Sequence, residues 1–333
     1  MGENEMLNAC VRFVKKNTVL AIAMAAALIT MCIVPPDAAY AGYLDFKTLT
    51  CLFCVLAVVC ALKNVRFFTF LARKIVQLTG NARMAILALV YITFIGSMLI
   101  ANDMALLTFL PLGYYVLAAT GQMKYLAFTF IMQNIAANLG GMLTPFGNPQ
   151  NLYLYTRFSI PNGEFVSIMW PPFALAIVIV FRAIPYWIGL IVIPAALLIL
   201  DRKALKQVDY ALLFTFVCFF LFAGNMARIP AVRSFFSAAL EKSTLLMSAA
   251  SCQVISNVPT AILLSQFTDN YRELLWGVNI GGTGTLIASL ASLITFREYT
   301  RIYPGRAGYY IARFSAFNFG FLAVMLLFCQ LLR

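Results

Sequence analysis

The sequence contains no histidine in its 333 residues. This absence excludes histidine metal sites, histidine general bases and serine–histidine triads. The chain also has no H-E-x-x-H and no G-x-S-x-G motif, which leaves an intramembrane enzyme without obvious catalytic groups. Charged residues are scarce, at 11% of the chain against about 25% in soluble domains. We therefore expect no catalytic residue and no resident cofactor.

Apolar residues, in contrast, make up 62% of the chain. Long apolar runs recur from residue 17 to residue 331, and each spans or nearly spans the ~20 residues of a bilayer crossing. No polar segment is long enough to form a separate soluble domain. The sequence predicts an all-α polytopic protein of the plasma (inner) membrane, with residues 1–333 in a single membrane domain.

The formal net charge of +12 does not indicate nucleic-acid binding, because the basic residues lie in short loops between apolar runs. If the N-terminus is cytoplasmic and both two-armed segments return to the side they left, fifteen Lys and Arg residues lie on the cytoplasmic side and seven on the other. This asymmetry follows the positive-inside rule and favours a cytoplasmic N-terminus. Two full crossings per two-armed segment would leave the count unchanged, so charge does not decide between these arrangements.

The first 40 residues have two interpretations. Arg12, Lys15 and Lys16 precede an apolar stretch, and Ala39-Tyr40-Ala41 resembles a cleavage site for a signal peptide. The apolar stretch nevertheless runs almost to bilayer length, which favours a retained extra helix in residues 1–40. The segments discussed below start after it.

Apolar runs, Pro, Gly and charge divide the rest of the chain into two series of segments. We expect the following order in the first: helices at 17–34 and 47–63, an amphipathic stretch at 66–80, two arms at 83–99 and 104–118, an interrupted segment at 124–157 and an apolar run at 173–200. In the second we expect a helix at 208–225, an amphipathic link at 226–241, two arms at 243–255 and 259–268, an interrupted segment at 271–295, a basic link at 297–306 and a helix at 308–331.

The two series match each other in order. An offset of 141 residues superimposes Asn138, Gly140, Gly141 and Thr144 on Asn279, Gly281, Gly282 and Thr285, and an offset of 155 superimposes Asn102 on Asn257. The topology above gives the series opposite orientations. We therefore predict an inverted repeat, of residues 41–200 and 201–333, with two re-entrant hairpins and two interrupted transmembrane helices, an arrangement typical of secondary transporters.

The interruptions are the strongest local signal. Residues 138–151 hold three Gly, two Pro and several Asn, and residues 281–285 hold three Gly. A continuous helix would be strained there, and a broken helix at membrane depth persists only when it is buried in protein or lines a cavity. The alternative is a surface loop between two short helices. The position of both stretches in the centre of apolar runs favours the broken helix.

The tips of the two-armed segments supply the complementary groups. Asn102 and Asn257 each precede a helical arm, whose N-terminus attracts anions, while unwound carbonyls and Asn, Ser and Thr oxygens suit hard cations such as sodium. These Asn residues could also simply cap helices. Asp103 could bind a proton or cation, or only cap its arm. We expect substrate and ion to bind among Asn102, Asp103, Asn138, Gly140, Gly141, Thr144, Gly147, Asn148, Asn151, Ser256, Asn257, Thr260, Gly281, Gly282, Thr283 and Thr285.

These motifs resemble the ion transporter superfamily. The resemblance rests on Asn102-Asp103-Met104 through Pro111, Thr144 through Leu152, Ser256 through Thr260 and Gly281 through Ile287, and it covers about residues 40–330. The nearest branch is citrate-transporter-like, which includes divalent anion:sodium symporters, arsenite permeases and a sodium–proton antiporter group. The resemblance implies a homodimer with a fixed scaffold and a moving transport part. It also implies sodium sites at Asn102 with Gly140 and Gly141, and at Ser256 and Asn257 with Gly281 and Gly282.

The chain departs from these relatives at specific positions. The symporters commonly carry Ser-Asn-Thr at both tips, whereas this chain has Ala101-Asn102-Asp103 and Ser256-Asn257-Val258. The arsenite and antiporter branches read Gly-Asp-Pro-Pro-Asn at the first break, where this chain has the neutral Gly147-Asn148-Pro149-Gln150-Asn151. The first hypothesis is a secondary transporter that moves a small organic or inorganic anion of the citrate or dicarboxylate kind, coupled to Na⁺ or H⁺. The alternative is a cation/proton antiporter or arsenite-type exporter that uses Asp103.

Overall fold

The computed structural model describes residues 13–14, 17–64, 82–169, 195, 198–199 and 202–332, and all regular structure in these residues is helical. Three of the described helices are long and apolar enough to cross a membrane: Arg83–Ile100, Tyr210–Arg228 and Ala307–Leu331. The predicted amphipathic stretch at 66–80 and most of the predicted apolar run at 173–200 lie outside the described residues. The described part agrees with an all-α polytopic membrane protein.

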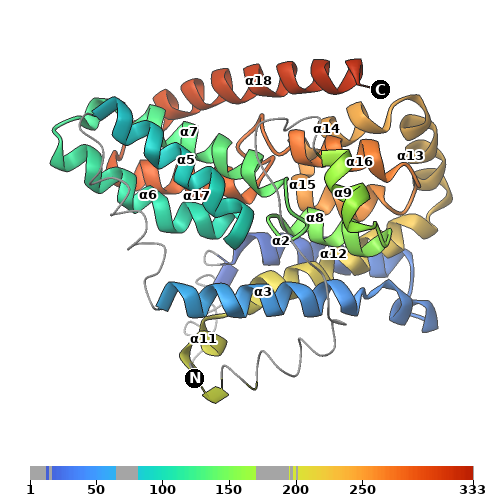
Figure 1. The fold of residues 1–333 in the computed structure, drawn as a ribbon. Helices are drawn as coiled ribbons and strands as arrows, with labels where there is room; N and C mark the ends of the chain where they lie inside the picture. The colour runs from blue at the N-terminus through green and yellow to red at the C-terminus, as the bar shows by residue number, and fades with distance from the viewer. Residues whose placement is uncertain are drawn as a thin grey trace.

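One layer of helices lies along the lower edge of Figure 1. It contains α2 (Thr18–Ile33), α3 (Phe46–Asn64), α11 (Arg202–Gln207) and α12 (Tyr210–Arg228), with the 3₁₀ turn η1 (Ala38–Tyr43) after α2. The buried Asn225 amide donates to Thr30 Oγ1 (3.2 Å), and Arg228 pairs with Asp37 at 2.7 Å. These contacts join α2 and the start of η1 to α12 across nearly two hundred residues of sequence.

A second group lies at the left of Figure 1: α5 (Ala82–Ile100), α6 (Asn102–Ala119), η2 (Met123–Tyr125), α7 (Leu126–Gly141) and α17 (Leu290–Ile302). Pro111 lies inside α6, where proline removes a backbone donor. The buried Gln133 of α7 donates to Phe109 O (3.1 Å) and Thr93 Oγ1 (3.0 Å) beside it. This glutamine connects the three helices α5, α6 and α7.

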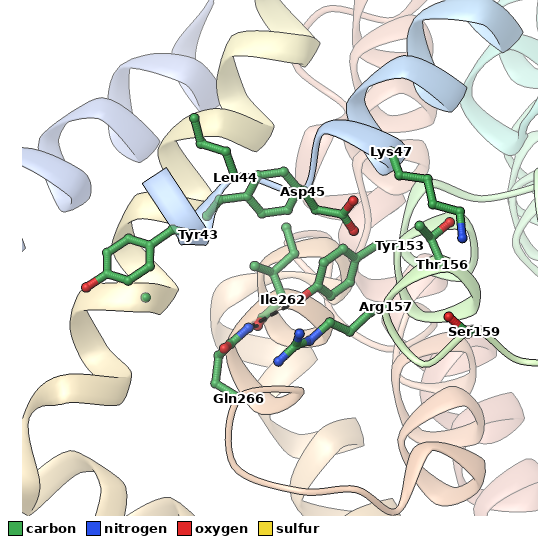
Figure 2. A pocket seen from close by; sticks show the side chains of 13 residues that line it. Tyr43, Leu44, Asp45, Lys47, Tyr153, Thr156, Arg157, Ser159, Ile262 and Gln266 are labelled. Carbon is green, nitrogen blue, oxygen red and sulfur yellow. Dashed lines mark hydrogen bonds between the residues drawn. The ribbon is translucent and has the colours of Figure 1, made fainter. Parts of the chain in front are cut away.

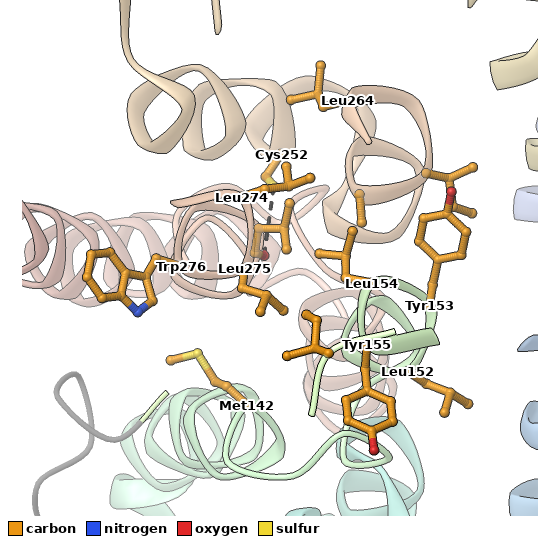
Figure 3. Packing of buried hydrophobic residues seen from close by; sticks show 14 of the residues in the cluster. Met142, Leu152, Tyr153, Leu154, Tyr155, Cys252, Leu264, Leu274, Leu275 and Trp276 are labelled. Carbon is orange, nitrogen blue, oxygen red and sulfur yellow. Dashed lines mark hydrogen bonds between the residues drawn. The ribbon is translucent and has the colours of Figure 1, made fainter. Parts of the chain in front are cut away.

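The third group lies at the right: α8 (Pro149–Arg157), α9 (Asn162–Met169), α13 (Pro230–Lys242), α14 (Thr244–Ile255), α15 (Asn257–Leu264) and α16 (Tyr271–Ile280). Its centre is a cluster of buried aromatic and aliphatic side chains that includes Tyr153, Leu154, Leu275 and Trp276 (Figure 3). Trp276 satisfies its indole N–H on Ile168 O at 2.6 Å. The long α18 (Ala307–Leu331) runs along the top of Figure 1 and contacts α7, α16 and α17.

The helix breaks differ in detail from the sequence prediction. Gly140 and Gly141 are the last residues of α7, so the first break covers residues 142–148 and α8 starts at Pro149. The second break covers residues 281–289. The predicted basic link at 297–306 was wrong in its first part, because α17 continues to Ile302. The amphipathic link at 226–241 contains α13, and α9 was not predicted.

Candidate functional site

The arms of each two-armed segment meet at a residue with a strained backbone. Ala101 joins α5 to α6 at φ 64° and ψ 149°, and Ser256 joins α14 to α15 at φ 71° and ψ 160°. This region of backbone space is populated almost only by glycine and costs about 1–3 kcal/mol for other residues. The same uncommon joint therefore occurs at the two positions that the sequence offset of 155 relates.

Each tip is hydrogen-bonded to a helix break. The Asn102 N–H donates to Gly147 O (3.1 Å), and the Asn257 N–H donates to Ala288 O (2.9 Å). Each asparagine Oδ1 accepts from the next backbone N–H at 2.9 Å, that of Asp103 or Val258. Asn102 and Asn257 are the first residues of their helices rather than the residues that precede them. Their side chains fold over the helix N-terminus. In the first turn of α15 no N–H group is then left free, because the Thr260 N–H donates to Ser256 O and residue 259 is proline.

Two further contacts are shared by the two tips. Thr144 Oγ1 donates to Met98 O (2.8 Å), and Thr285 Oγ1 donates to Gln253 O (3.1 Å). Gly140 lies so close to α5 that a Cβ atom there would be 2.2 Å from Phe94 O. A Cβ on Gly281 would likewise be 2.9 Å from Ala249 Cα of α14. The Gly-Gly pairs thus let each first arm pack directly on a broken helix.

The tips are chemically unequal. Asp103 lies beside Asn102, and its Oδ1 is buried without a hydrogen-bond partner. Val258 takes the corresponding place in the second tip. There Gln253 is the distinctive residue, because its Nε2 donates to Gly281 O (2.8 Å) and Thr283 O (3.1 Å) while its Oε1 accepts from Thr285 N. The sequence argument missed Gln253, although an amide in an apolar arm was a usable signal.

Buried amides connect the two broken helices. Asn279 of α16 donates to Asn151 Oδ1 (2.5 Å) and accepts from Asn148 Nδ2 (3.2 Å), both at the start of α8. In the other direction, Asn134 of α7 contacts α17 through Ser292 (3.4 Å) and Thr295 (3.3 Å). Sequence reasoning missed Asn134, Ser292 and Thr295 as network members.

The predicted site residues fall into two constellations. The first constellation surrounds the Ala101 joint and contains Asn102, Asp103, Asn138, Gly140, Gly141, Thr144, Gly147, Asn148 and Asn151. Asn138 belongs to it because its Oδ1 accepts from Asn102 Nδ2 at 3.2 Å. The second constellation contains Ser256, Asn257, Thr260, Gly281, Gly282, Thr283 and Thr285; its Thr260 and Thr283 hydroxyls donate to backbone carbonyls. Asn279 and its bonds to α8 join the two constellations.

Apart from the Asp103 carboxyl, both constellations consist of neutral oxygen and N–H groups. Carbonyl, amide and hydroxyl oxygens suit hard cations, and the positive dipole ends of α6 and α15 suit an anion. Within the described ranges, no group of three or more Cys, Asp or Glu side chains could hold a metal ion. Glu273 is a buried acid that sequence reasoning overlooked. Its carboxylate accepts a hydrogen bond from the Leu245 N–H at 3.0 Å and so satisfies a backbone donor in the first turn of α14.

A polar cavity of about 380 Å³ opens at the opposite end of α8 and α15 from the tips. Figure 2 shows the Arg157 guanidinium reaching into it beside Gln266 and Tyr153, with Asp45 and Lys47 on the facing wall. Both Asp45 carboxylate oxygens accept from Thr48 at the start of α3. The cavity has two walls, one formed by α3 and α12 and the other by α8 and α15. The basic side chains Lys47 and Arg157 face the space between these walls.

The sequence model of a family described as citrate transporter matches residues 9–271. The chain belongs to this family. It is a membrane transporter, and the resemblance inferred from its tip and break motifs is confirmed. The match covers both joints and the first break, and it ends at Tyr271, the first residue of α16.

The descriptions of two relatives are consistent with a membrane transporter. One, an uncharacterized transporter of Methanocaldococcus jannaschii, is 30% identical over 288 aligned positions, covering 76% of this chain and 81% of the relative. The other, inner membrane protein YbiR of Escherichia coli, is 28% identical over 282 positions, covering 69% of this chain and 74% of the relative. Neither description names a substrate or a coupling ion.

Proposed function

We propose that this transporter moves a small organic or inorganic anion of the citrate or dicarboxylate kind, coupled to Na⁺ or H⁺. The observation that carries the proposal is the paired bond between tip and break, Asn102 N–H to Gly147 O and Asn257 N–H to Ala288 O. Each bond holds a helix N-terminus against unwound backbone, which is the combination that secondary transporters use for anionic substrates and coupling cations.

The proposal includes two re-entrant hairpins of opposite orientation. Arg83 at the start of α5 and Lys124 after the end of α6 line one cavity. The ends of the two arms that lie away from the tip are therefore on the same side in this proposal. α8 continues for nine residues, about 13 Å, beyond the break that the first tip contacts. Beyond α8, Glu164 accepts a hydrogen bond from Tyr271 at the start of α16, and α14 starts beside Glu273. These contacts support a second hairpin that enters from the other side.

In this mechanism the coupling cation binds in each constellation, near Asn102 with Gly140 and Gly141, and near Ser256 and Asn257 with Gly281 and Gly282. The anion binds between the N-termini of α6 and α15, where the positive ends of two helix dipoles add. The buried Asn279 amide lies between both constellations, with Asn148 and Asn151 in contact. An occupied site at one tip therefore influences the geometry of the other.

The cavity in Figure 2 supports an access route for anions. Arg157 and Lys47 offer positive charge between the layer of α3 and α12 and the helices α8 and α15. Alternating access of the elevator kind would move these two walls against each other. We place the protein in the plasma membrane as a homodimer with a cytoplasmic N-terminus, which puts this cavity on the non-cytoplasmic side.

One observation favours a second candidate, cation/proton antiport or arsenite-type export. Asp103 lies at a tip, and its Oδ1 is buried without a hydrogen-bond partner. A carboxylate in that position could carry a proton through the transport cycle. Val258 at the other tip has no such group, so this chemistry would belong to the first hairpin alone.

The test is transport by purified protein in liposomes with sodium and proton gradients imposed separately. We expect uptake of citrate, succinate or sulfate that rises with one inward gradient. Asn257→Ala should lower transport at least about tenfold, because it removes an amide at the tip. Asn318→Ala is the matched control, since this buried amide bonds only along its own helix, to Phe314 O. Full transport by folded Asn257→Ala protein would remove the tip from the mechanism.

Asp103→Asn separates the two candidates. Anion uptake that is driven by sodium should survive this change. A proton-coupled exchange that uses the carboxylate should be lost. An exchange that persists unchanged in Asp103→Asn would contradict the second candidate.

A further inference from the structure

A groove of about 670 Å³ lies between the beginnings of α5, α7 and α18, and none of its lining residues belongs to either constellation. Three cationic side chains line it, namely Arg83, Lys124 and Arg313, and no acidic side chain does. In the described part of the chain, the ion pairs are Asp37–Arg228 and Glu298–Arg301, so none of the three groove cations is in one. Three positive groups from three helices thus face one space without a counter-charge.

The rest of the groove is aromatic and aliphatic. Tyr125 and Tyr309 lie beside the charges, with the Lys124 Nζ 5.1 Å from the Tyr125 ring centre and the Arg313 guanidinium 5.3 Å from that of Tyr309. Tyrosine at this level is typical of the membrane–water boundary. The remaining lining residues are Ile86, Leu87, Ala127, Phe128, Ile131 and Phe317.

The polar and apolar parts are separated along the helix axes. Along η2 and α7 the groove runs from Lys124 to Ile131, and along α18 from Tyr309 to Phe317, about 10 and 12 Å of helix respectively. Arg313 lies in the second turn of α18, from where a long side chain reaches toward the boundary. The groove therefore offers positive charge at one end and an apolar channel at the other.

We propose that this groove binds an anionic phospholipid. Arg83 and Lys124 contact the phosphate, Arg313 contacts the phosphate or the glycerol ester, and an acyl chain lies along Leu87, Ile131 and Phe317. Basic pockets between transmembrane helices are suited to such headgroups, and the apolar channel distinguishes this ligand from a soluble anion. The proposal is independent of the transported substrate. Since α7 continues from the groove to Gly140 and Gly141, lipid occupancy stabilises the helix that forms the first constellation.

The test compares two charge-matched triple variants of the full chain. Arg83→Gln, Lys124→Gln and Arg313→Gln remove the groove cations. Arg233→Gln, Lys242→Gln and Arg297→Gln remove three exposed cations elsewhere. Lipid binding is measured by native mass spectrometry, and thermal stability is measured with added phosphatidylglycerol or phosphatidylcholine. We expect the groove variant to bind phosphatidylglycerol at least about tenfold more weakly than the control, a loss equal to about one charge-assisted bond.

Three outcomes would overturn the proposal. The first is equal binding and equal stabilisation of both triple variants by phosphatidylglycerol. The second is displacement of the lipid by millimolar inorganic phosphate, which would indicate a site for soluble anions. The third is cross-linking of a second copy of the chain across Leu87 and Phe128, which would make the groove a subunit interface.

Discussion

At the residue scale, the close approach of the helices depends on glycines, which carry a hydrogen atom where other residues carry a side chain. Gly140 and Gly281 have backbone atoms of other residues within 3 Å of where a Cβ would stand. Backbone atoms of packed helices do not move aside without changing the helix packing. Packing alone therefore excludes a side chain at these two positions, whatever ligand the site binds.

We expect Gly140→Ala and Gly281→Ala to destabilise the protein by about 1–3 kcal/mol, as overpacked cores do. Gly308→Ala is the control, since a Cβ there meets nothing within 4 Å and alanine favours the helix. Thermal unfolding in detergent measures all three. Equal Tm values for Gly140→Ala and Gly308→Ala would contradict the described packing of α5 on α7.

Most residues that make up the two constellations could be predicted from the sequence, whereas the hydrogen-bond partners of these residues could not. Asn102, Gly140 and Gly281 stand out because Asn and Gly are unusual in apolar runs. Gln253 and Asn134 stand out less, because the importance of either amide depends on what a distant helix places beside it. Such partners are a property of the tertiary structure.

At the element scale, the joints at Ala101 and Ser256 have backbone angles that residues other than glycine rarely adopt. Ala101→Gly should raise stability by about 1 kcal/mol, because glycine adopts φ 64° and ψ 149° without a Cβ clash. Ala312→Gly, the same change on an exposed position of α18, should lower stability by about 1 kcal/mol. Chemical or thermal unfolding of the two variants gives the comparison. A loss of stability in both would mean that the joint is not strained.

The pairing of α2 with α12 carries a pH dependence. The hydrogen bond from Arg228 lowers the pKa of Asp37. A carboxyl whose pKa is lower in the folded state stabilises the fold above its unfolded value, and this contribution disappears as pH falls through the folded value. Asp37→Asn should therefore lower the Tm slightly at neutral pH, and the difference should close below about pH 4. Asp269→Asn, another exposed acid, is the control; a gap that persists in acid would contradict the account.

Helix bounds of the long apolar elements were predictable to within a few residues, as α2, α3, α5 and α12 illustrate. Among the short helices, α14 and α15 correspond to the arms predicted at 243–255 and 259–268, whereas α9 and α13 were not predicted as helices. α9 and α13 are too polar or too short to give an apolar run, and their helical state depends on packing against α16, α12 and α14. The breaks were predicted in the right place, but Gly140 and Gly141 close α7 rather than starting the unwound segment, whereas Gly281 and Gly282 do start theirs.

At the scale of the whole molecule, the proposed opposite orientation of the two hairpins can be measured by labelling from either side of the membrane. In a chain whose eight cysteines have been replaced by serine or alanine, single cysteines at Lys124, Arg157 and Arg272 report it. We expect an impermeant thiol reagent to label Lys124→Cys from one side of the membrane. Arg157→Cys and Arg272→Cys should be labelled from the other. Labelling of all three from the same side would contradict the proposed topology.

The helical class and the family were within reach of the sequence, because composition and motif order are sequence properties. The inverted repeat and the dimer remain predictions. Substrate and coupling ion are beyond what neutral amides, hydroxyls and carbonyls specify, since these groups serve many anions and more than one cation.

The crossed amide contacts have a consequence for how the chain could be divided. Asn279 is bonded to the start of α8, and Asn134 is bonded to α17, so each half supplies partners for buried groups of the other. A polypeptide that stopped before α12 would leave Asn134, Asn148 and Asn151 without those partners in a nonpolar interior. We therefore expect that neither half folds on its own and that the two halves, made as separate chains, must associate to satisfy these buried amides.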